Sequence, residues 1–184
     1  MPRGRKKNSE PKEEKSYSSI PEAETIIEKL VERYPKVLFA VNPKTVNVFG
    51  VDNSERPASN HTMAKIRCID GVMRALLDKH NVQVRYIIDL YWADWNSWKN
   101  LTKMWIIFHE LLHIPAEEKG LIKHDVQDFT IALSVAGIDG YTSEGLPNLL
   151  EGEVVKFRED LVAKMHMAKD DLKDKEDDAP TPPE

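Results

Sequence analysis

The feature that most constrains this 184-residue chain is a segment that predicts an almost entirely apolar helix. The helix is expected to begin at an N-cap on Asp94 or Asn96 and to continue to about His113, before Pro115. Apolar side chains at helical spacing form one stripe along this helix: Trp98, Leu101, Trp105, Phe108 and Leu112. Further apolar residues widen this stripe: Ile106, Ile107 and Leu111. A helix that is apolar on nearly every side is expected at the centre of a domain.

The segments around this helix predict both strands and helices. Alternating side chains indicate strands at 45–51 and 82–91, and 62–69 is a weaker β candidate. Apolar residues at helical spacing predict further helices at 22–34, 70–80, 125–136 and 148–167. We therefore predict an α+β fold with a small mixed sheet, the central apolar helix and two C-terminal helices.

The helix at 70–80 carries two specific expectations. Asp70 is expected to cap its N-terminus with its side chain. Its apolar residues are expected to face inward: Val72, Met73, Leu76 and Leu77.

Composition divides the chain into one folded domain and two tails. Residues 1–16 consist mainly of charged residues and proline, and residues 169–184 are acidic and end in a proline-containing stretch. Neither segment has enough apolar surface to offset the entropy cost of ordering, so we expect both tails to be disordered and the domain to span 17–168.

The domain itself is mildly acidic, which argues against a broad DNA-binding face. Nucleic acid could be contacted only through the basic tail, at Arg3-Gly4-Arg5-Lys6-Lys7.

The number of cysteines and the hydropathy of the chain limit where the protein can be located in the cell and which kind of metal site it can have. Cys68 is the only cysteine, which excludes an intramolecular disulfide and a cysteine-based zinc knuckle. No segment resembles a signal peptide, and the longest apolar stretch, Met104–Phe108, is too short to span a bilayer. We expect a cytoplasmic protein without a membrane partner, and any metal site must use histidine and carboxylate ligands.

Two histidines and a glutamate interrupt the apolar helix in the segment His109-Glu110-Leu111-Leu112-His113. Residues four apart project from one helix face, so His109 and His113 can reach one tetrahedral zinc ion. Glu110 lies about 100° further round the helix, beside the metal, where a general base could take a proton from a zinc-activated water. A structural helix with hydrogen-bonded histidines is the alternative, but burying these three groups without a shared partner would be costly.

A catalytic zinc site needs a third protein ligand and keeps one position open. His124 is the expected third ligand, because Pro115 ends the helix and the flexible Gly120 lets the loop fold back over the two histidines. The carboxylates of Glu144 and Glu151 are the alternatives if the ligand lies further downstream.

Two stretches carry a family resemblance: Trp105-Ile-Ile-Phe-His-Glu-Leu-Leu-His-Ile114 and Gly120-Leu-Ile-Lys-His-Asp-Val-Gln-Asp-Phe129. Over approximately residues 64–141 the chain resembles the putative phage metallopeptidase family and, more distantly, the SprT-like zincin metalloproteases. The resemblance implies a zincin-like domain that hydrolyses peptide bonds in a protein or peptide substrate. It also implies His109, His113 and His124 as zinc ligands and Glu110 as the base. The single cysteine excludes the C-terminal zinc ribbon of SprT-like proteins, so their DNA-linked roles are not carried over.

Two other functions fit parts of the same pattern. The pair His124-Asp125, with His109 and Asp128, is similar to the metal site of HD-type phosphohydrolases, which are all-helical. The short spacing and the strand expected at 82–91 argue against that class. A non-catalytic binding protein stabilised by zinc differs from an enzyme only by one additional ligand that closes the site.

Overall fold

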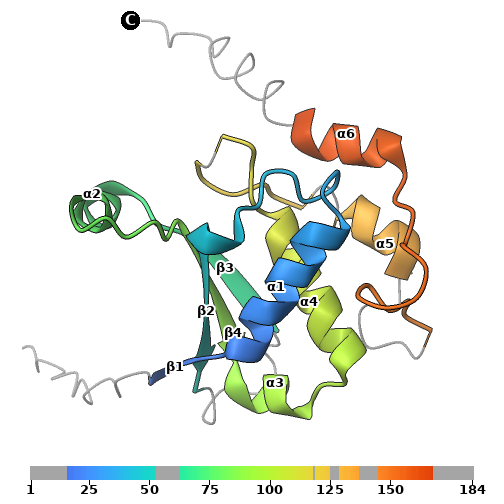
Figure 1. Ribbon diagram of the computed structural model, residues 1–184, viewed down its shortest axis with the longest axis horizontal. Coiled ribbons are helices and arrows are strands. Elements are labelled where there is room, and N and C mark those ends of the chain that lie inside the picture. The colour runs from blue at the N-terminus through green and yellow to red at the C-terminus, as the bar shows by residue number, and fades with distance from the viewer. Residues whose placement is uncertain (1–15, 53–62, 118, 125–128, 137–144, 168–184) are drawn as a thin grey trace, which may run out of the picture.

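The computed structural model describes residues 16–52, 63–117, 119–124, 129–136 and 145–167. Helices and strands are mixed along the chain (Figure 1), which confirms the predicted α+β class. In chain order the elements are β1 (Tyr17–Ser19), α1 (Pro21–Arg33), the 3₁₀ helix η1 (Pro43–Thr45), β2 (Val46–Val51), β3 (Ala64–Cys68), α2 (Gly71–Lys79), β4 (Tyr86–Tyr91), α3 (Trp92–Ser97), α4 (Asn100–Leu112), α5 (Thr130–Ala136) and α6 (Glu159–Met167). No helix among these described residues is long and apolar enough to cross a membrane.

The strands form one mixed four-stranded sheet in the order β1-β2-β4-β3. β2 and β4 are parallel, with Val48 opposite Ile88, whereas β1 and β3 run antiparallel to their neighbours. Val48 and Ile88 are fully buried, as the alternation of apolar residues predicts. β3 lies at an edge of the sheet, and this edge forms one wall of the site described below.

The helix α4 is central, as its nearly continuous apolar surface predicts. It contacts both α1 and the edge strand β3. The side chains of Trp105, Ile107 and Phe108 are fully buried, and the indole N–H of Trp105 donates a hydrogen bond to the carbonyl oxygen of Pro147 at 3.0 Å. The core therefore holds α4 rigidly, together with the polar residues near its C-terminus.

The prediction of one continuous helix from Asp94 or Asn96 to His113 is wrong at its start. The chain forms the short helix α3, leaves helical geometry at Trp98 and Lys99, and begins α4 at Asn100. The N–H of Trp98 and the hydroxyl of Ser97 both donate to the carbonyl oxygen of Asp94, which closes α3. The two extended residues change the chain direction between the helices.

The helix α2 is present, but the expectation that its apolar residues face inward is wrong for three of the four, since only Leu77 is partly buried. Val72 is 87% exposed, and Met73 and Leu76 are also exposed. Figure 1 shows α2 projecting away from the sheet, and with the described residues alone none of its side chains is fully buried. Asp70 is the N-cap residue, yet its side chain makes no capping hydrogen bond.

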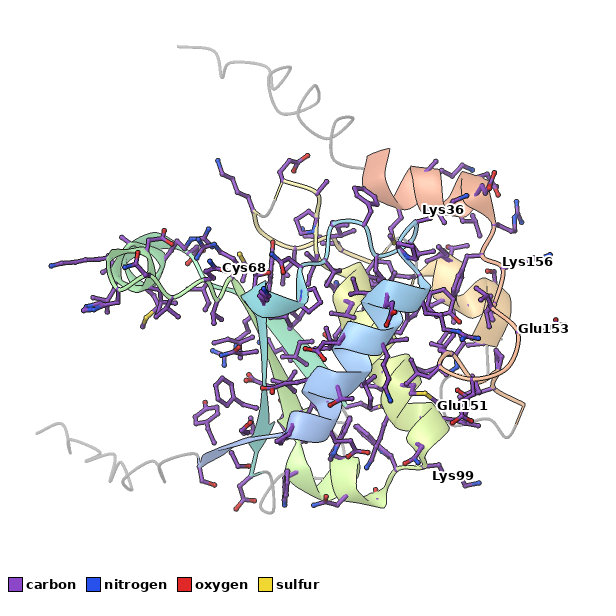
Figure 2. The ribbon with its side chains drawn as sticks, viewed as in Figure 1. Lys36, Cys68, Lys99, Glu151, Glu153 and Lys156 are labelled. Atoms are coloured by element: carbon purple, nitrogen blue, oxygen red, sulfur yellow. The ribbon has the colours of Figure 1, made fainter. Side chains whose placement is uncertain are left out.

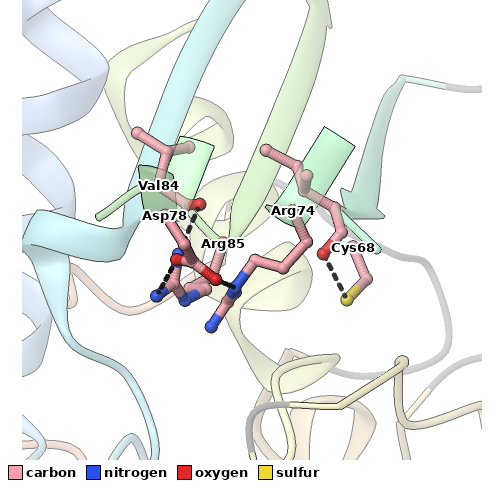
Figure 3. Close-up of polar contacts among 6 residues, drawn as sticks. Cys68, Arg74, Asp78, Val84 and Arg85 are labelled. Carbon is pink, nitrogen blue, oxygen red and sulfur yellow. Dashed lines mark hydrogen bonds and ion pairs between the residues drawn. The ribbon is translucent and has the colours of Figure 1, made fainter. Parts of the chain in front are cut away.

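Ionic contacts connect α2 to the chain that leads into β4. The Asp78 carboxylate pairs with Arg74 at 3.1 Å and with Arg85 at 2.8 Å (Figure 3). Arg85 also donates a hydrogen bond to the carbonyl oxygen of Val84 at 3.3 Å. These contacts bring the two parts of the chain together beside the sheet.

Two other boundaries and one short strand differ from the sequence prediction. The strand β4 begins at Tyr86 rather than Val82, because the N–H of Val82 bonds to the carbonyl oxygen of Leu77 at 2.9 Å. The last helix begins at Glu159 rather than Asn148, whose side-chain oxygen accepts hydrogen bonds from two following backbone N–H groups. The short β1 was not predicted. The first part of the helix predicted at 125–136 and both tails, apart from Ser16, lie outside the described residues.

Gly50 in β2 is required by close packing. A Cβ atom at this position would lie 2.6 Å from Cε3 of Trp92 and 3.0 Å from the hydroxyl oxygen of Ser18. We expect Gly50→Ala to lower the free energy of unfolding by about 1–3 kcal/mol, because the ring and the strand must separate. Urea unfolding measures this change. Gly145→Ala is the matched control, because a Cβ there meets nothing within 4 Å; equal stability of both variants would contradict the expectation.

Candidate metal centre

Three histidines converge at the C-terminal end of α4. His109 lies in its last turn, His113 is the C-cap residue, and His124 comes from the following loop. One ring nitrogen of each lies within 4.8 Å of the others. The structure therefore brings together the three side chains that the sequence singled out as candidate ligands.

The loop after α4 folds back through a tight turn and two hydrogen bonds. Gly120 has a φ of +67°, a conformation that favours glycine. Beyond it, the N–H of Ile122 donates to the carbonyl oxygen of His113 at 2.8 Å. The His113 ring in turn donates from Nδ1 to the carbonyl oxygen of Ile122 at 2.6 Å. This reciprocal pair holds the loop against the helix end and places His124 over the other two rings.

The contact with Ile122 also sets the protonation of the His113 ring. A carbonyl oxygen can only accept, so Nδ1 must carry the proton. In the neutral imidazole, Nε2 then has the lone pair that a metal ligand needs. A backbone carbonyl that orients a histidine in this way is the usual partner of a ligating imidazole.

The spacing of one pair of ring nitrogens is close to that of two ligands on a small tetrahedral ion. Two ligands at a zinc–nitrogen distance of about 2.0–2.1 Å and a tetrahedral angle are about 3.3 Å apart. Nε2 of His109 and Nε2 of His124 are 3.0 Å apart, so both atoms point at the same space. The three donor atoms lie within 4.8 Å of one another, so the rings would have to move closer together to bind one zinc ion at once.

Phe129 forms the floor of the cluster and was not predicted. Its ring lies 5.4 Å from that of His109, 4.7 Å from His113 and 5.0 Å from His124, measured between ring centroids. Phe129 is fully buried and contacts all three imidazoles edge-on or nearly so. It limits the rotation of the three rings from below.

Glu110 lies between α4 and the edge strand. Its side chain is only 6% exposed, and Oε2 accepts a hydrogen bond from the backbone N–H of Ile66 in β3 at 2.9 Å. This hydrogen bond fixes the orientation of the carboxylate and compensates part of the cost of burying its charge.

The carboxylate and the histidines share one cavity of about 390 Å³. Its walls are α4, the loop around His124 and the edge strand β3. The lining comprises Met63, Ala64, Lys65, Ile66, Ile106, His109, Glu110, His113, Leu121 and His124. A buried carboxylate, three imidazoles and a strand edge therefore line the same cavity, which is open to solvent.

Of the two alternative ligands, only Glu151 lies within the described residues, and it is not part of this cluster. Glu151 is exposed, and its carboxylate accepts a hydrogen bond from the Asn148 side chain at 3.1 Å. Glu144 lies outside the described residues, as do Asp125 and Asp128 of the HD-type alternative. The sheet contradicts the all-helical fold that this alternative requires. Within the described ranges, the three histidines alone form a group that could hold a metal ion.

Comparison with known proteins finds a family model that matches most of the chain. The model of the putative phage metallopeptidase family matches residues 15–149, which is most of the chain. The chain belongs to this family. The match includes α4, the loop with His124 and the whole sheet, so the family covers the complete candidate centre. Neither the curated proteins nor the solved structures compared with the chain include a significant match.

Membership of the metallopeptidase family implies a metal, and the three histidines form a group that could hold one. The more distant resemblance to SprT-like zincins stays a prediction.

Proposed function

We propose that this protein is a zinc-dependent peptidase with a single metal centre. In this proposal His109, His113 and His124 bind zinc, and Glu110 is the general base. The observation that carries the proposal is the convergence of three imidazoles beside a buried carboxylate in one cavity. The family to which the chain belongs supports the reaction class.

The donor set favours zinc over the common hard cations. Magnesium and calcium prefer carboxylate, carbonyl and water oxygens, whereas imidazole nitrogen suits zinc. Three protein ligands with one open position are typical of catalytic rather than structural zinc sites. Bound zinc would lower the pKa of a coordinated water to about 7 and polarise the carbonyl group of the substrate.

Glu110 is suited to move the proton in this reaction. Its carboxylate lines the same cavity as the three imidazoles and is held by the N–H of Ile66. In the proposed reaction Glu110 accepts a proton from the attacking water and transfers it to the nitrogen of the departing amine. The hydrogen bond from Ile66 keeps the carboxylate in place during both transfers.

The strand edge beside the centre supports a peptide as the substrate. The backbone of Met63–Ile66 forms one wall of the cavity, and β3 is an edge strand. An extended peptide can add to such an edge through main-chain hydrogen bonds. This arrangement would place the scissile carbonyl of an extended protein segment beside the three histidines.

Metal removal and replacement test the proposed function. We expect the purified protein to cleave a pool of quenched fluorescent peptides, to lose this activity after treatment with a chelator, and to regain it with one equivalent of zinc. Magnesium should not restore cleavage. Cleavage that persists without metal would contradict the proposal. Zinc binding without cleavage of any peptide would instead favour a non-catalytic protein stabilised by zinc.

A further inference from the structure

The metal cavity has an apolar part to which the proposed reaction assigns no role. Besides the three histidines and Glu110, the lining includes five apolar residues: Met63, Ala64, Ile66, Ile106 and Leu121. Three of these belong to the buried core, whereas Met63 and Leu121 are only partly buried and pack against it. Met63 and Leu121 therefore have apolar surface that a bound molecule can cover.

These apolar residues border the candidate ligands on three elements. Ile106 precedes His109 by three residues on α4, so both project from one face of the helix. Leu121 adjoins Ile122, whose N–H donates to the carbonyl oxygen of the C-cap residue of α4 at 2.8 Å. Met63 directly precedes the edge strand β3. A molecule bound at the histidines is therefore next to apolar side chains from the helix, the loop and the strand edge.

Lys65 is the one basic residue in this lining, and it lines the cavity with its backbone. Successive residues of a strand point to opposite faces, and Lys65 alternates with the buried Ala64 and Ile66. Lys65 lies opposite Asp89, which pairs with Arg67 at 2.8 Å on the other face of the sheet. Among the described residues, the proposed general base is then the only carboxylate or ammonium group that faces this cavity.

A bound peptide substrate must bring a side chain to this part of the cavity. Consecutive Cα atoms of a peptide lie about 3.8 Å apart, so both residues of the scissile bond lie close to the metal. In an extended peptide their side chains point in opposite directions, so one of them points toward the cavity lining. Such side-chain pockets beside a strand edge give specificity to peptide recognition.

We propose that these five apolar residues form a subsite for a medium-sized apolar side chain, such as that of leucine, next to the scissile bond. Leu121 and Met63 are the specificity-determining residues. This inference rests on the proposed peptidase function and names its substrate class. An apolar side chain gains from the water it displaces, whereas a charged one loses its hydration without a partner of opposite charge to replace it.

Calorimetric titration of the intact, zinc-loaded chain tests the subsite without catalysis. Four probes bind zinc through the same hydroxamate group. Hexanohydroxamate carries an apolar chain, two further probes carry a chain of similar length that ends in an ammonium or a carboxylate group, and acetohydroxamate carries a single methyl group. We expect hexanohydroxamate to bind at least about tenfold more tightly than each of the other three.

Cleavage of a peptide series tests the same preference in the reaction. The peptides are identical except for one position, which holds leucine, alanine, glutamate or lysine, and mass spectrometry of the products locates the cut. We expect kcat/KM for the leucine peptide to exceed that for alanine by at least about tenfold. The glutamate and lysine peptides should be cleaved at least about 100-fold less efficiently than the leucine peptide.

Variants of Leu121 locate the subsite. Leu121→Lys and Leu121→Glu should each weaken hexanohydroxamate binding at least about tenfold, and they should favour the carboxylate and the ammonium probe respectively. Leu121→Ala removes the apolar contact without adding a charge, and it keeps the test valid if a charged variant does not fold. Zinc content and melting temperature are measured for every variant.

Leu150→Lys is the matched control. Leu150 is also a partly buried leucine, and it lies outside the metal cavity. Its neighbour Glu151 is labelled in Figure 2 on the other side of the molecule from Cys68, the last residue of β3. We expect Leu150→Lys to leave the affinities for all four hydroxamates unchanged.

The outcomes separate this inference from the proposed function. Equal affinity for hexanohydroxamate and acetohydroxamate, or unchanged selectivity in the Leu121 variants, would overturn the subsite and leave the peptidase function standing. A zinc-loaded protein that prefers hexanohydroxamate but cleaves no peptide would support the subsite and contradict the peptidase function. A chain that binds no zinc would overturn both.

Discussion

Replacing Glu110 with glutamine is expected to leave zinc bound and to lower kcat for peptide hydrolysis by about 10²–10⁴-fold, the usual contribution of a general base. Glutamine has nearly the same shape, and its side-chain oxygen can still accept the hydrogen bond that Ile66 donates to Oε2. The cavity wall should therefore stay intact. Only the ability to take the proton is lost.

The matched control for this variant is Glu151→Gln. Glu151 is an exposed carboxylate outside the metal cavity, and we expect its replacement to change neither zinc content nor kcat. Metal analysis and peptide cleavage are measured on the same samples. Undiminished hydrolysis by Glu110→Gln would contradict the role of Glu110, and loss of zinc from this variant would show that Glu110 is a ligand.

Removing any one of the three histidines is expected to weaken zinc binding by roughly 100-fold. Zinc binding free energies of about 10–16 kcal/mol divided over four ligands correspond to roughly 3 kcal/mol per ligand. His124→Ala is the most informative variant, because this side chain is exposed and its loss should not disturb the core. Competition with a chromophoric chelator measures the affinity.

His80→Ala provides the control for the histidine variants. His80 is exposed at the end of α2, the helix that projects from the sheet in Figure 1, and its removal should leave zinc affinity unchanged. If His124→Ala binds zinc as tightly as this control does, the third ligand is a different residue.

The elements whose positions follow from local periodicity could be predicted from the sequence. The strand at β2 and the central position of α4 result from patterns of side chains within single segments. The exposure of α2 could not be predicted in this way, because an apolar helix face shows what could be buried and not whether another element covers it. The break at Trp98 likewise accompanies the contact of α3 with β4, which periodicity within the segment does not contain.

At the candidate centre, too, one part could be predicted from the sequence and another part could not. The spacing of His109 and His113 on one helix indicates a shared metal directly, and the turn at Gly120 makes His124 a reasonable third residue. The carbonyl of Ile122 that orients His113 and the N–H of Ile66 that holds the carboxylate are backbone groups, which every residue has. No side-chain pattern marks them, so only the folded chain identifies them.

The central claim is that three histidines hold a zinc ion with one position left for water. X-ray absorption spectroscopy at the zinc edge of the loaded protein tests this most directly. We expect the zinc to be coordinated by three imidazole nitrogens and one oxygen at about 2.0–2.1 Å, and this coordination to change when His124 is replaced by alanine. A sphere of four protein ligands, or one that is the same in His124→Ala, would contradict it.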